Sequence, residues 1–311
     1  MENTAKTQPR ILVPVDFSAQ QDAVVARAIR LADRMQGELI LFHCASPVEL
    51  SMVAIEPVYV PALVMERFVS DHLQAASAKL ADLCHSLGSD RPVQTLVKST
   101  TPFEGIVTAA DELDCDCIVM GSHGAGLDRF LLGSVAESVA AAAPCPVVIQ
   151  RDTEEVEAIE SVLVGIDFSA YSKPLVELAR NLASETGEIH LLHCWQPPHL
   201  DTAHVFGDPG HAGLVAVLNE GMELHSRELE RFVDSLPDDE RYRLHLETGR
   251  AAQTLINAYD EYGVQAVLVG AHDAETSQAL LGSVSDRVLR HAKTTVVLTE
   301  AARARWAAPP L

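Results

Sequence analysis

The segment Ile11-Leu-Val-Pro-Val-Asp16-Phe-Ser18 decides the fold, because a near copy of it, Val162-Leu-Val-Gly-Ile-Asp167-Phe-Ser169, stands just past the middle of the chain. Further matched segments follow in the same order, and Leu132-Gly-Ser-Val135 returns as Leu281-Gly-Ser-Val284. The first pair lies 151 residues apart and the last pair 149, which is the length of a domain rather than of a solenoid repeat. The sequence therefore predicts two copies of one domain, over residues 1–152 and 153–311, joined by a charged linker at 151–160.

Each copy alternates short apolar runs with longer amphipathic ones. The β-branched run 11–15 predicts a buried strand. Ser18, with Gln21 three residues on, predicts a capping box that opens a helix ending near Met35. Strongly apolar strands that alternate with helices are typical of parallel sheets covered by helices on both faces. The other predicted elements are strands 38–44, 92–97, 117–120, 146–150, 161–166, 188–194, 241–247, 264–269 and 295–299, and helices 63–87, 103–113, 134–142, 172–186, 212–235, 251–261 and 283–291.

The charge balance and the cysteines narrow the class of protein. The 44 acidic side chains outnumber the 23 basic ones and give a net charge of -21, which repels nucleic acid and anionic membranes. The polar first ten residues lack the apolar core of a signal peptide, and no apolar run is long enough to span a bilayer. The six cysteines show no disulfide framework. We expect a cytoplasmic protein that binds neither nucleic acid nor membrane.

Small and polar residues gather where ligands bind in an open α/β sheet, beyond the carboxyl ends of the strands. Asp16 follows the first strand, and Gly121-Ser-His-Gly124 follows the fourth. Gly133-Ser134 then opens a helix, whose free N–H groups and positive dipole end favour phosphate. Glycines let phosphate oxygens approach the backbone closely. Asp16, as a carboxylate, suits ribose hydroxyls or an amino group.

These motifs make the chain resemble a tandem member of the universal stress protein family. The resemblance rests on Pro14-Val-Asp16-Phe-Ser18, His43-Cys44, Met120-Gly-Ser-His-Gly124, Leu132-Gly-Ser-Val135 and Pro144-Cys-Pro146, and it runs through both copies. It implies two doubly wound parallel five-stranded sheets, each with strand order 3-2-1-4-5. It also implies that the last strands of the two sheets pair, so that the copies form an internal pseudo-dimer; two chains could associate further as a homodimer.

The resemblance also implies the ligand and the residues that bind it. In the family, residues that match Asp16 and Cys44 contact adenosine, and those that match Gly121, Gly124, Gly133 and Ser134 hold ribose and phosphates, usually with Mg²⁺ or Mn²⁺. We predict a site for ATP, AMP or ADP, with no catalytic residue and no metal held by the protein itself. The predicted binding residues are Pro14, Val15, Asp16, Cys44, Met120, Gly121, His123, Gly124, Arg129, Gly133, Ser134 and Val135.

Both copies depart from the family pattern, the second more strongly. Eight residues instead of nine separate Gly124 from Gly133, which tightens the first loop. In the second copy Asp273 replaces Gly124 and places a negative charge where phosphate would lie, at a cost upwards of about 1 kcal/mol. We therefore predict that the first copy binds nucleotide. The second copy, with Asp167, Gly270, Asp273, Gly282 and Ser283 at matching positions, binds weakly, binds a less charged molecule or is structural.

Several alternatives stay open at this stage. Asp16 and Asp167 could serve only to start helices. His43 and His193, which end matching strands, are more typical of satisfied histidines than of ligands. The leading hypothesis is a nucleotide-responsive regulator of stress tolerance, with unidentified protein partners. The alternatives are a slow ATP or pyrophosphate hydrolase assisted by Asp16 and His123, and an interaction module that binds no nucleotide.

Overall fold

A computed structural model of the chain describes residues 8–45, 62–88, 92–123, 132–151, 157–197, 211–271, 281–292 and 295–299. The predicted domain boundary between residues 152 and 153 lies outside these residues. The elements of the first half are β1 (Arg10–Pro14), α1 (Gln21–Met35), β2 (Glu38–Cys44), α3 (Ala62–Ser86), β3 (Val93–Lys98), α4 (Pro102–Glu112), β4 (Cys117–Gly121), α5 (Ser134–Ala142) and β5 (Val147–Gln150).

The second half repeats this order. Its elements are β6 (Ile159–Ile166), α6 (Ser172–Leu182), β7 (Ala183–Trp195), α7 (His211–Asp234), β8 (Tyr242–Thr248), α8 (Ala251–Tyr262), β9 (Ala266–Gly270), α9 (Ser283–His291) and β10 (Thr295–Thr299). We call β1–β5 with their helices the first half, and β6–β10 with theirs the second half.

The strands form one ten-stranded sheet in the order β3-β2-β1-β4-β5-β10-β9-β6-β7-β8. Within each half the strands run parallel, and the order 3-2-1-4-5 is confirmed. The halves meet where β5 and β10 pair antiparallel, with Val148 opposite Val297. This confirms the predicted pseudo-dimer, and it covers two apolar strand edges that would otherwise invite other chains.

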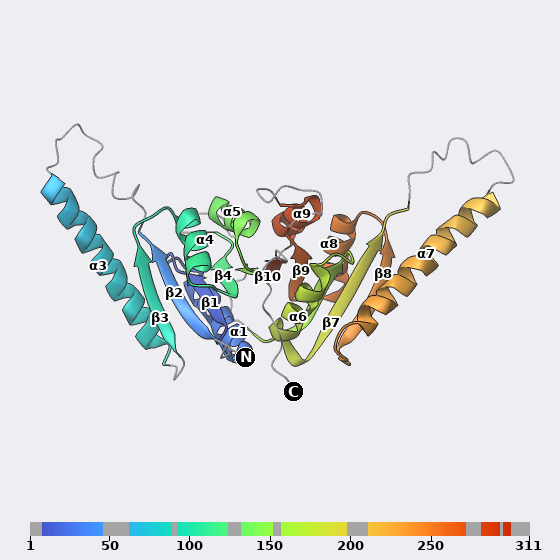
Figure 1. Cartoon of the computed structure of the whole chain (residues 1–311), viewed down its shortest axis with the longest axis horizontal. Coiled ribbons are helices and arrows are strands. Elements are labelled where there is room, and N and C mark those ends of the chain that lie inside the picture. The colour runs from blue at the N-terminus through green and yellow to red at the C-terminus, as the bar shows by residue number, and fades with distance from the viewer. Residues whose placement is uncertain are drawn as a thin grey trace, which may run out of the picture.

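Helices cover both faces of the sheet, and each face has one core that continues across both halves. One core packs α1, α3, α6 and α7 against the sheet, around residues such as Leu31, Leu80 and Leu178. The other packs α4, α5, α8 and α9 against the opposite face, around Ile106, Val139 and Leu255. In Figure 1 the two halves splay apart from β10, with α3 and α7 on the two outer flanks. The continuous cores bind the two halves into one folded unit.

Polar contacts at the seam between the halves are asymmetric. Arg27, which is only 7% exposed, donates from Nε to Oε1 of Gln150 at 3.0 Å. The same oxygen accepts the hydroxyl of Thr295 at 3.1 Å, so Gln150 joins the halves. Arg151 donates to the carbonyl of Leu289 in α9. The residue of α6 that matches Arg27 is Leu178, so the Arg27 contact has no counterpart in the second half.

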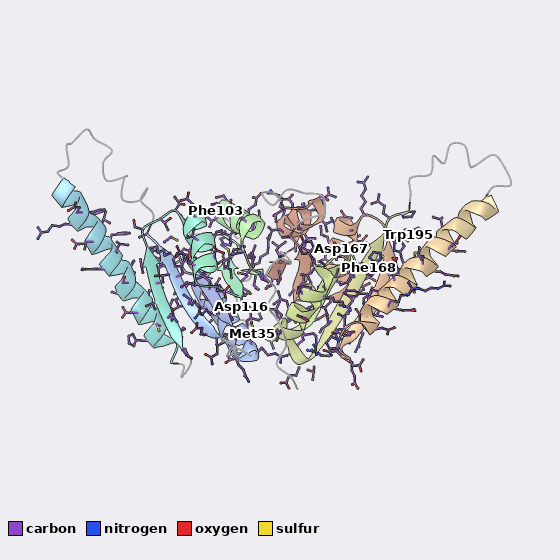
Figure 2. The ribbon with its side chains drawn as sticks, viewed as in Figure 1. Met35, Phe103, Asp116, Asp167, Phe168 and Trp195 are labelled. Atoms are coloured by element: carbon purple, nitrogen blue, oxygen red, sulfur yellow. The ribbon has the colours of Figure 1, made fainter. Side chains whose placement is uncertain are left out.

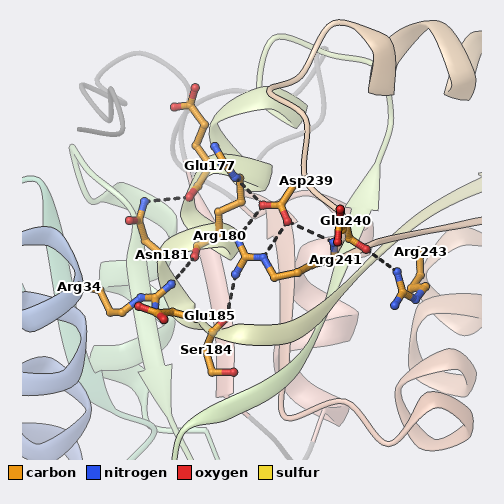
Figure 3. A network of polar contacts seen from close by, with 10 residues as sticks. All are labelled: Arg34, Glu177, Arg180, Asn181, Ser184, Glu185, Asp239, Glu240, Arg241 and Arg243. Carbon is orange, nitrogen blue, oxygen red and sulfur yellow. Dashed lines mark hydrogen bonds and ion pairs between the residues drawn. The ribbon is translucent and has the colours of Figure 1, made fainter. Parts of the chain in front are cut away.

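A second polar network stabilises the second half near the start of β8 (Figure 3). Asp239 accepts from Arg180 at 2.9 Å and from Arg241 at 2.7 Å. These guanidinium groups hold the pKa of the Asp239 carboxyl well below its usual range. Arg34 of α1 donates to the carbonyl of Arg180 at 3.3 Å, so the first half contacts this network too.

Most predicted elements lie within two residues of their predicted ends, but α6 and β7 do not, and β7, predicted from residue 188, begins at Ala183. The prediction of a helix over 172–186 was wrong at its end, because α6 stops at Leu182. Ala183 already pairs with Ile159, and a bulge follows before the regular register resumes. The backbone of Ala183 is already extended, with φ −68° and ψ 149°, so the chain leaves the helix to join the sheet at this residue.

Candidate functional site

The described residues of the first half enclose a cavity of about 310 Å³ at the carboxyl ends of β1, β2 and β4. This is the edge of an open α/β sheet where ligands bind. Its walls are completed by the start of α1, the start of α4 and the first turn of α5. The lining residues are Pro14, Val15, Asp16, Ser18, Gln20, Gln21, Val24, Val25, Phe42, His43, Cys44, Pro102, Ile106, Met120, Gly121, His123, Gly133, Ser134, Val135 and Ala136.

The loop after β1 presents an exposed carboxylate on a constrained backbone. Oδ1 of Asp16 accepts the backbone N–H of Ser18 at 3.0 Å, and Phe17 has a φ of 57°, which is unusual for a residue with a side chain. The predicted capping box was wrong. Helix α1 begins at Gln21, after Gln20 as N-cap, and no side chain caps it. The short loop uses Ser18 to orient Asp16 instead, which turns the carboxylate into a fixed part of the cavity wall.

The end of β2 forms a wall with two polar side chains. Nδ1 of His43 donates to the carbonyl of Val15 at 2.7 Å, and the ring lies 4.6 Å from that of Phe17. His43 is therefore the satisfied histidine that the sequence favoured, although it also lines the cavity. Burial raises the pKa of the Cys44 thiol to about 12, so this thiol stays protonated. Both groups can contact an uncharged part of a ligand.

The opposite wall carries the features that suit an anion. Gly133 is the N-cap of α5, and its N–H donates to the carbonyl of Ser122 at 2.7 Å. Among the described residues no side chain caps α5, so within them the N–H groups of its first turn have no side-chain oxygen as acceptor. Gly121 ends β4, and a Cβ there would lie 2.7 Å from Oε1 of Gln20. The space beside the backbone at this position depends on glycine.

Two glutamines at the start of α1 belong to the site, and the sequence reasoning missed both. Gln20 is 3% exposed, and its amide joins the N–H of His123 at 3.4 Å to the carbonyl of Arg151 at 3.1 Å. Oε1 of Gln21 is buried, and no hydrogen-bond partner for it is found among the described residues. A buried acceptor without a donor is costly, and a ligand N–H or O–H would relieve that cost. Their position in the sequence, directly after the Asp16 loop, could have indicated that both glutamines lie at the site.

The structure brings the predicted residues together where it describes them. Pro14, Val15, Asp16, Cys44, Met120, Gly121, His123, Gly133, Ser134 and Val135 all line the one cavity. Gly124 and Arg129 lie outside the described residues. Convergence of residues from β1, β2, β4 and α5 and their adjoining loops on one cavity agrees with a binding site, while the contacts of each with a ligand stay a prediction.

A serine–histidine pair in this region does not form a nucleophile. Oγ of Ser122 lies 2.9 Å from Nδ1 of His123, but Ser122 is fully buried. A serine without access to substrate cannot attack it. Among the described residues, no cluster of three or more His, Cys, Asp or Glu side chains is arranged to hold a metal ion. None of the described helices is both long and apolar enough to cross a membrane.

The second half has a smaller cavity, of about 200 Å³, at the matching sheet edge. Oδ1 of Asp167 accepts three hydrogen bonds from its own loop: from the N–H of Ser169 at 2.9 Å, its hydroxyl at 2.6 Å, and the hydroxyl of Ser172 at 2.9 Å. Figure 2 shows Asp167 beside Phe168 at the end of β6. The lining residues are Gly165, Ile166, Asp167, Leu192, His193, Cys194, Ala251, Leu255, Val269, Gly270 and Val284.

The other predicted positions of the second half fall in different places. Gly270 lines the cavity, Gly282 is the N-cap of α9, and Ser283 is its first residue. Asp273, on which the predicted charge difference rests, lies outside the described residues. The described part of the chain nevertheless distinguishes the two halves by cavity size and by the contacts of the matching aspartates.

Comparison with known proteins gives the family. The model of the universal stress protein family matches residues 9–151 and 158–300. A universal stress protein of Mycolicibacterium smegmatis is 29% identical over 299 residues, covering 94% of this chain and 97% of that protein. One from Mycobacterium tuberculosis is 29% identical over 303 residues, with the same coverage of 94% and 97%. A crystal structure from Archaeoglobus fulgidus, also of a universal stress protein, is similar with a TM-score of 0.64 and 18% identity, over 95% of this chain and 99% of that one, and supports the fold.

Proposed function

The chain belongs to the universal stress protein family, and from this premise we propose that its first half binds an adenine nucleotide, ATP or AMP, as a regulatory signal. One observation carries the proposal: a single cavity of about 310 Å³ joins an apolar floor, a fixed carboxylate and an uncapped helix N-terminus. A nucleotide needs these three environments in this combination, for base, ribose and phosphate.

The base and ribose fit the part of the cavity next to β1 and β2. Met120, Phe42 and Ile106 supply apolar surface for a planar ring. Burying such surface contributes about 25 cal/mol per Å². Asp16 can accept from ribose hydroxyls, and the buried Oε1 of Gln21 can accept from a further ligand donor. Cys44, neutral at physiological pH, contacts the base without charge repulsion.

The phosphates fit the part next to β4 and α5. The N–H groups at the start of α5 and the positive end of its dipole favour an anion. Gly121 and Gly133 leave room for phosphate oxygens at the backbone. A Mg²⁺ ion bound with the nucleotide would be held chiefly by phosphate oxygens and water, and it would neutralise part of the phosphate charge.

We propose that the nucleotide acts as a signal rather than as fuel. Ser122, the hydroxyl next to His123, is fully buried and has no access to a bound phosphate. Gln20 gives a route for the signal, because it joins the cavity wall to the carbonyl of Arg151, whose side chain contacts α9 of the second half. The six cysteines, all free, suit a reducing compartment such as the cytoplasm.

Equilibrium binding of ATP and AMP to the full chain tests the proposal. We expect saturable binding that Gly133→Val abolishes, because a valine at the N-cap of α5 fills the phosphate end of the cavity. The matched control is Gly282→Val, at the N-cap of α9, which is expected to leave ATP binding unchanged. Absence of saturable binding, or equal loss in both variants, would contradict the proposal, and mass spectrometry of copurified small molecules identifies the bound nucleotide.

A further inference from the structure

The cavity of the second half keeps only the part of the site that would hold a planar ring. In the first half the cavity extends along the start of α1, with Gln20, Gln21 and Val24 among its lining residues. In the second half, among the described residues, no residue of α6 lines the cavity. Tyr171 and Ser172 stand in place of the two glutamines, and the hydroxyl of Ser172 bonds to Asp167.

The helix N-terminus is also withdrawn from this cavity. In the first half four consecutive residues, 133–136, line the cavity at the start of α5, whereas from α9 only Val284 does so among the described residues. Ser285, which replaces Ala136, is 1% exposed and donates its hydroxyl to the carbonyls of Ala271 and Gly282, each at 2.9 Å. Among the described residues, the cavity therefore has no helix N-terminus placed to bind phosphate.

The polar groups that remain are mostly satisfied within the protein. His193 donates from Nδ1 to the carbonyl of Ile166 at 2.7 Å, and its Nε2 lies 3.0 Å from Nδ1 of His225. Burial raises the pKa of the Cys194 thiol to about 11, so it is neutral. Asp167 is exposed, and its three loop bonds all reach Oδ1. Its other oxygen is the one anionic acceptor that the described lining offers a ligand.

Size and chemistry then define the ligand. A cavity of about 200 Å³ is smaller than the roughly 300–1,000 Å³ of sites for drug-sized molecules. An apolar cavity of about 150 Å³ can hold benzene. We propose that the second half binds a small, neutral, planar aromatic molecule with one N–H or O–H donor directed at Asp167. The choice of a planar ring rests on the base position proposed for the first half, while binding by the second half is tested without nucleotide.

Indole is a suitable probe, because it is neutral and bicyclic and carries one N–H. The titration uses the full chain with Ile106→Trp, which fills the cavity of the first half and leaves that of the second. We expect saturable binding by calorimetry. Indole carboxylate should bind at least about tenfold more weakly, because its negative charge is repelled by Asp167. N-methylindole, which lacks the donor, should also bind more weakly.

The matched variant adds Leu255→Trp, the equivalent substitution in the second half, and is expected to abolish indole binding. Crystals of the unsubstituted chain soaked with bromoindole give a second test that needs no variant to fold, with the bromine expected beside Leu255 and Val269. The proposal is overturned if indole shows no saturable binding, if the carboxylate binds equally well, or if bromine is absent from this cavity. Nucleotide binding is measured separately, so either proposal can fail alone.

Discussion

The two halves have the same loop geometry around their matching aspartates, but their cavities differ in size. In both, the residue after the aspartate has a positive φ, 57° at Phe17 and 60° at Phe168. In both, a histidine donates to the carbonyl before that aspartate at 2.7 Å. Yet the cavities measure about 310 and 200 Å³. Fold and loop geometry have been kept while the site has diverged.

A few side chains account for this divergence. Ser172 in place of Gln21 adds a donor that bonds to Asp167, and Ser285 in place of Ala136 adds a hydroxyl under the start of α9. Each new hydroxyl is satisfied by a neighbouring protein atom rather than left for a ligand. The second half has thus exchanged ligand contacts for internal hydrogen bonds, and substitutions at matched positions should separate binding from stability.

The largest difference between the halves is expected at the glycines that end β4 and β9. Gly121→Val should weaken ATP binding by about 100-fold or more, which is about 2.8 kcal/mol, because its Cβ would lie 2.7 Å from Oε1 of Gln20 and displace that amide. Gly270→Val should leave ATP binding unchanged. Calorimetry on the two variants checks this, with circular dichroism to verify folding; equal loss in both would break the comparison.

The seam should show the next largest effect, on stability. Arg27→Leu makes α1 resemble α6, which has Leu178 there, and deprives the carbonyl of Glu157 and the amide of Gln150 of a buried donor. We expect a loss of about 2 kcal/mol in the free energy of unfolding. Arg30→Leu, on the exposed side of α1, is the control and should change stability by less than about 0.5 kcal/mol. Chemical denaturation measures both, and similar values for the two would contradict the assignment of Arg27 to the seam.

Substitution of the two matched aspartates should affect different properties. Asp16→Ala removes a ligand contact and should weaken ATP binding by about tenfold, with little change in stability. Asp167→Ala removes the acceptor of three loop hydrogen bonds and should lower stability by about 1 kcal/mol without affecting ATP binding. Binding and thermal unfolding measured on both variants test this, and an Asp167→Ala chain that lost ATP binding would show that the halves are more alike than their contacts indicate.

A smaller effect is expected from pH, which should change the stability of the second half. Burial lowers the pKa of His190, His193 and His245 below the ordinary value of 6.5. The unfolded chain then binds more protons than the folded one, so stability is full above about pH 6.5 and falls as the pH drops below it. Hydrogen exchange of β7 and β8, compared at about pH 7.5 and about pH 5.5 after correction for intrinsic rates, should show this loss. Replacement of His190 and His245 by leucine should reduce it; an unchanged slope would contradict the assignment.

The sequence alone predicted the order of elements, the parallel sheets and the sheet edge at which the cavity lies, because those depend on local patterns; most of the lining residues were predicted only through the family resemblance. Apolar strands that end in Asp16 and Gly121 can only place these residues at one sheet edge. The pairing of β5 with β10 followed from the family resemblance, and Val148 opposite Val297 confirms it.

What the sequence did not predict depends on contacts between distant residues. The spacing of Ser18 and Gln21 fits a capping box, but Asp16 takes the N–H of Ser18 and α1 starts later. Nothing local to Gln20 indicates that its amide will span from His123 to Arg151. The early end of α6 likewise follows from Ala183, whose extended backbone pairs with Ile159, far back in the chain. Contacts of this kind appear only once the fold has brought the groups together.

The central claim is that nucleotide binds in the first half and not in the second. A crystal structure of the full chain with millimolar ATP tests it most directly. The account predicts ATP between Asp16 and the start of α5, with no nucleotide beside Asp167. Nucleotide in the second cavity alone, or at equal occupancy in both, would contradict it.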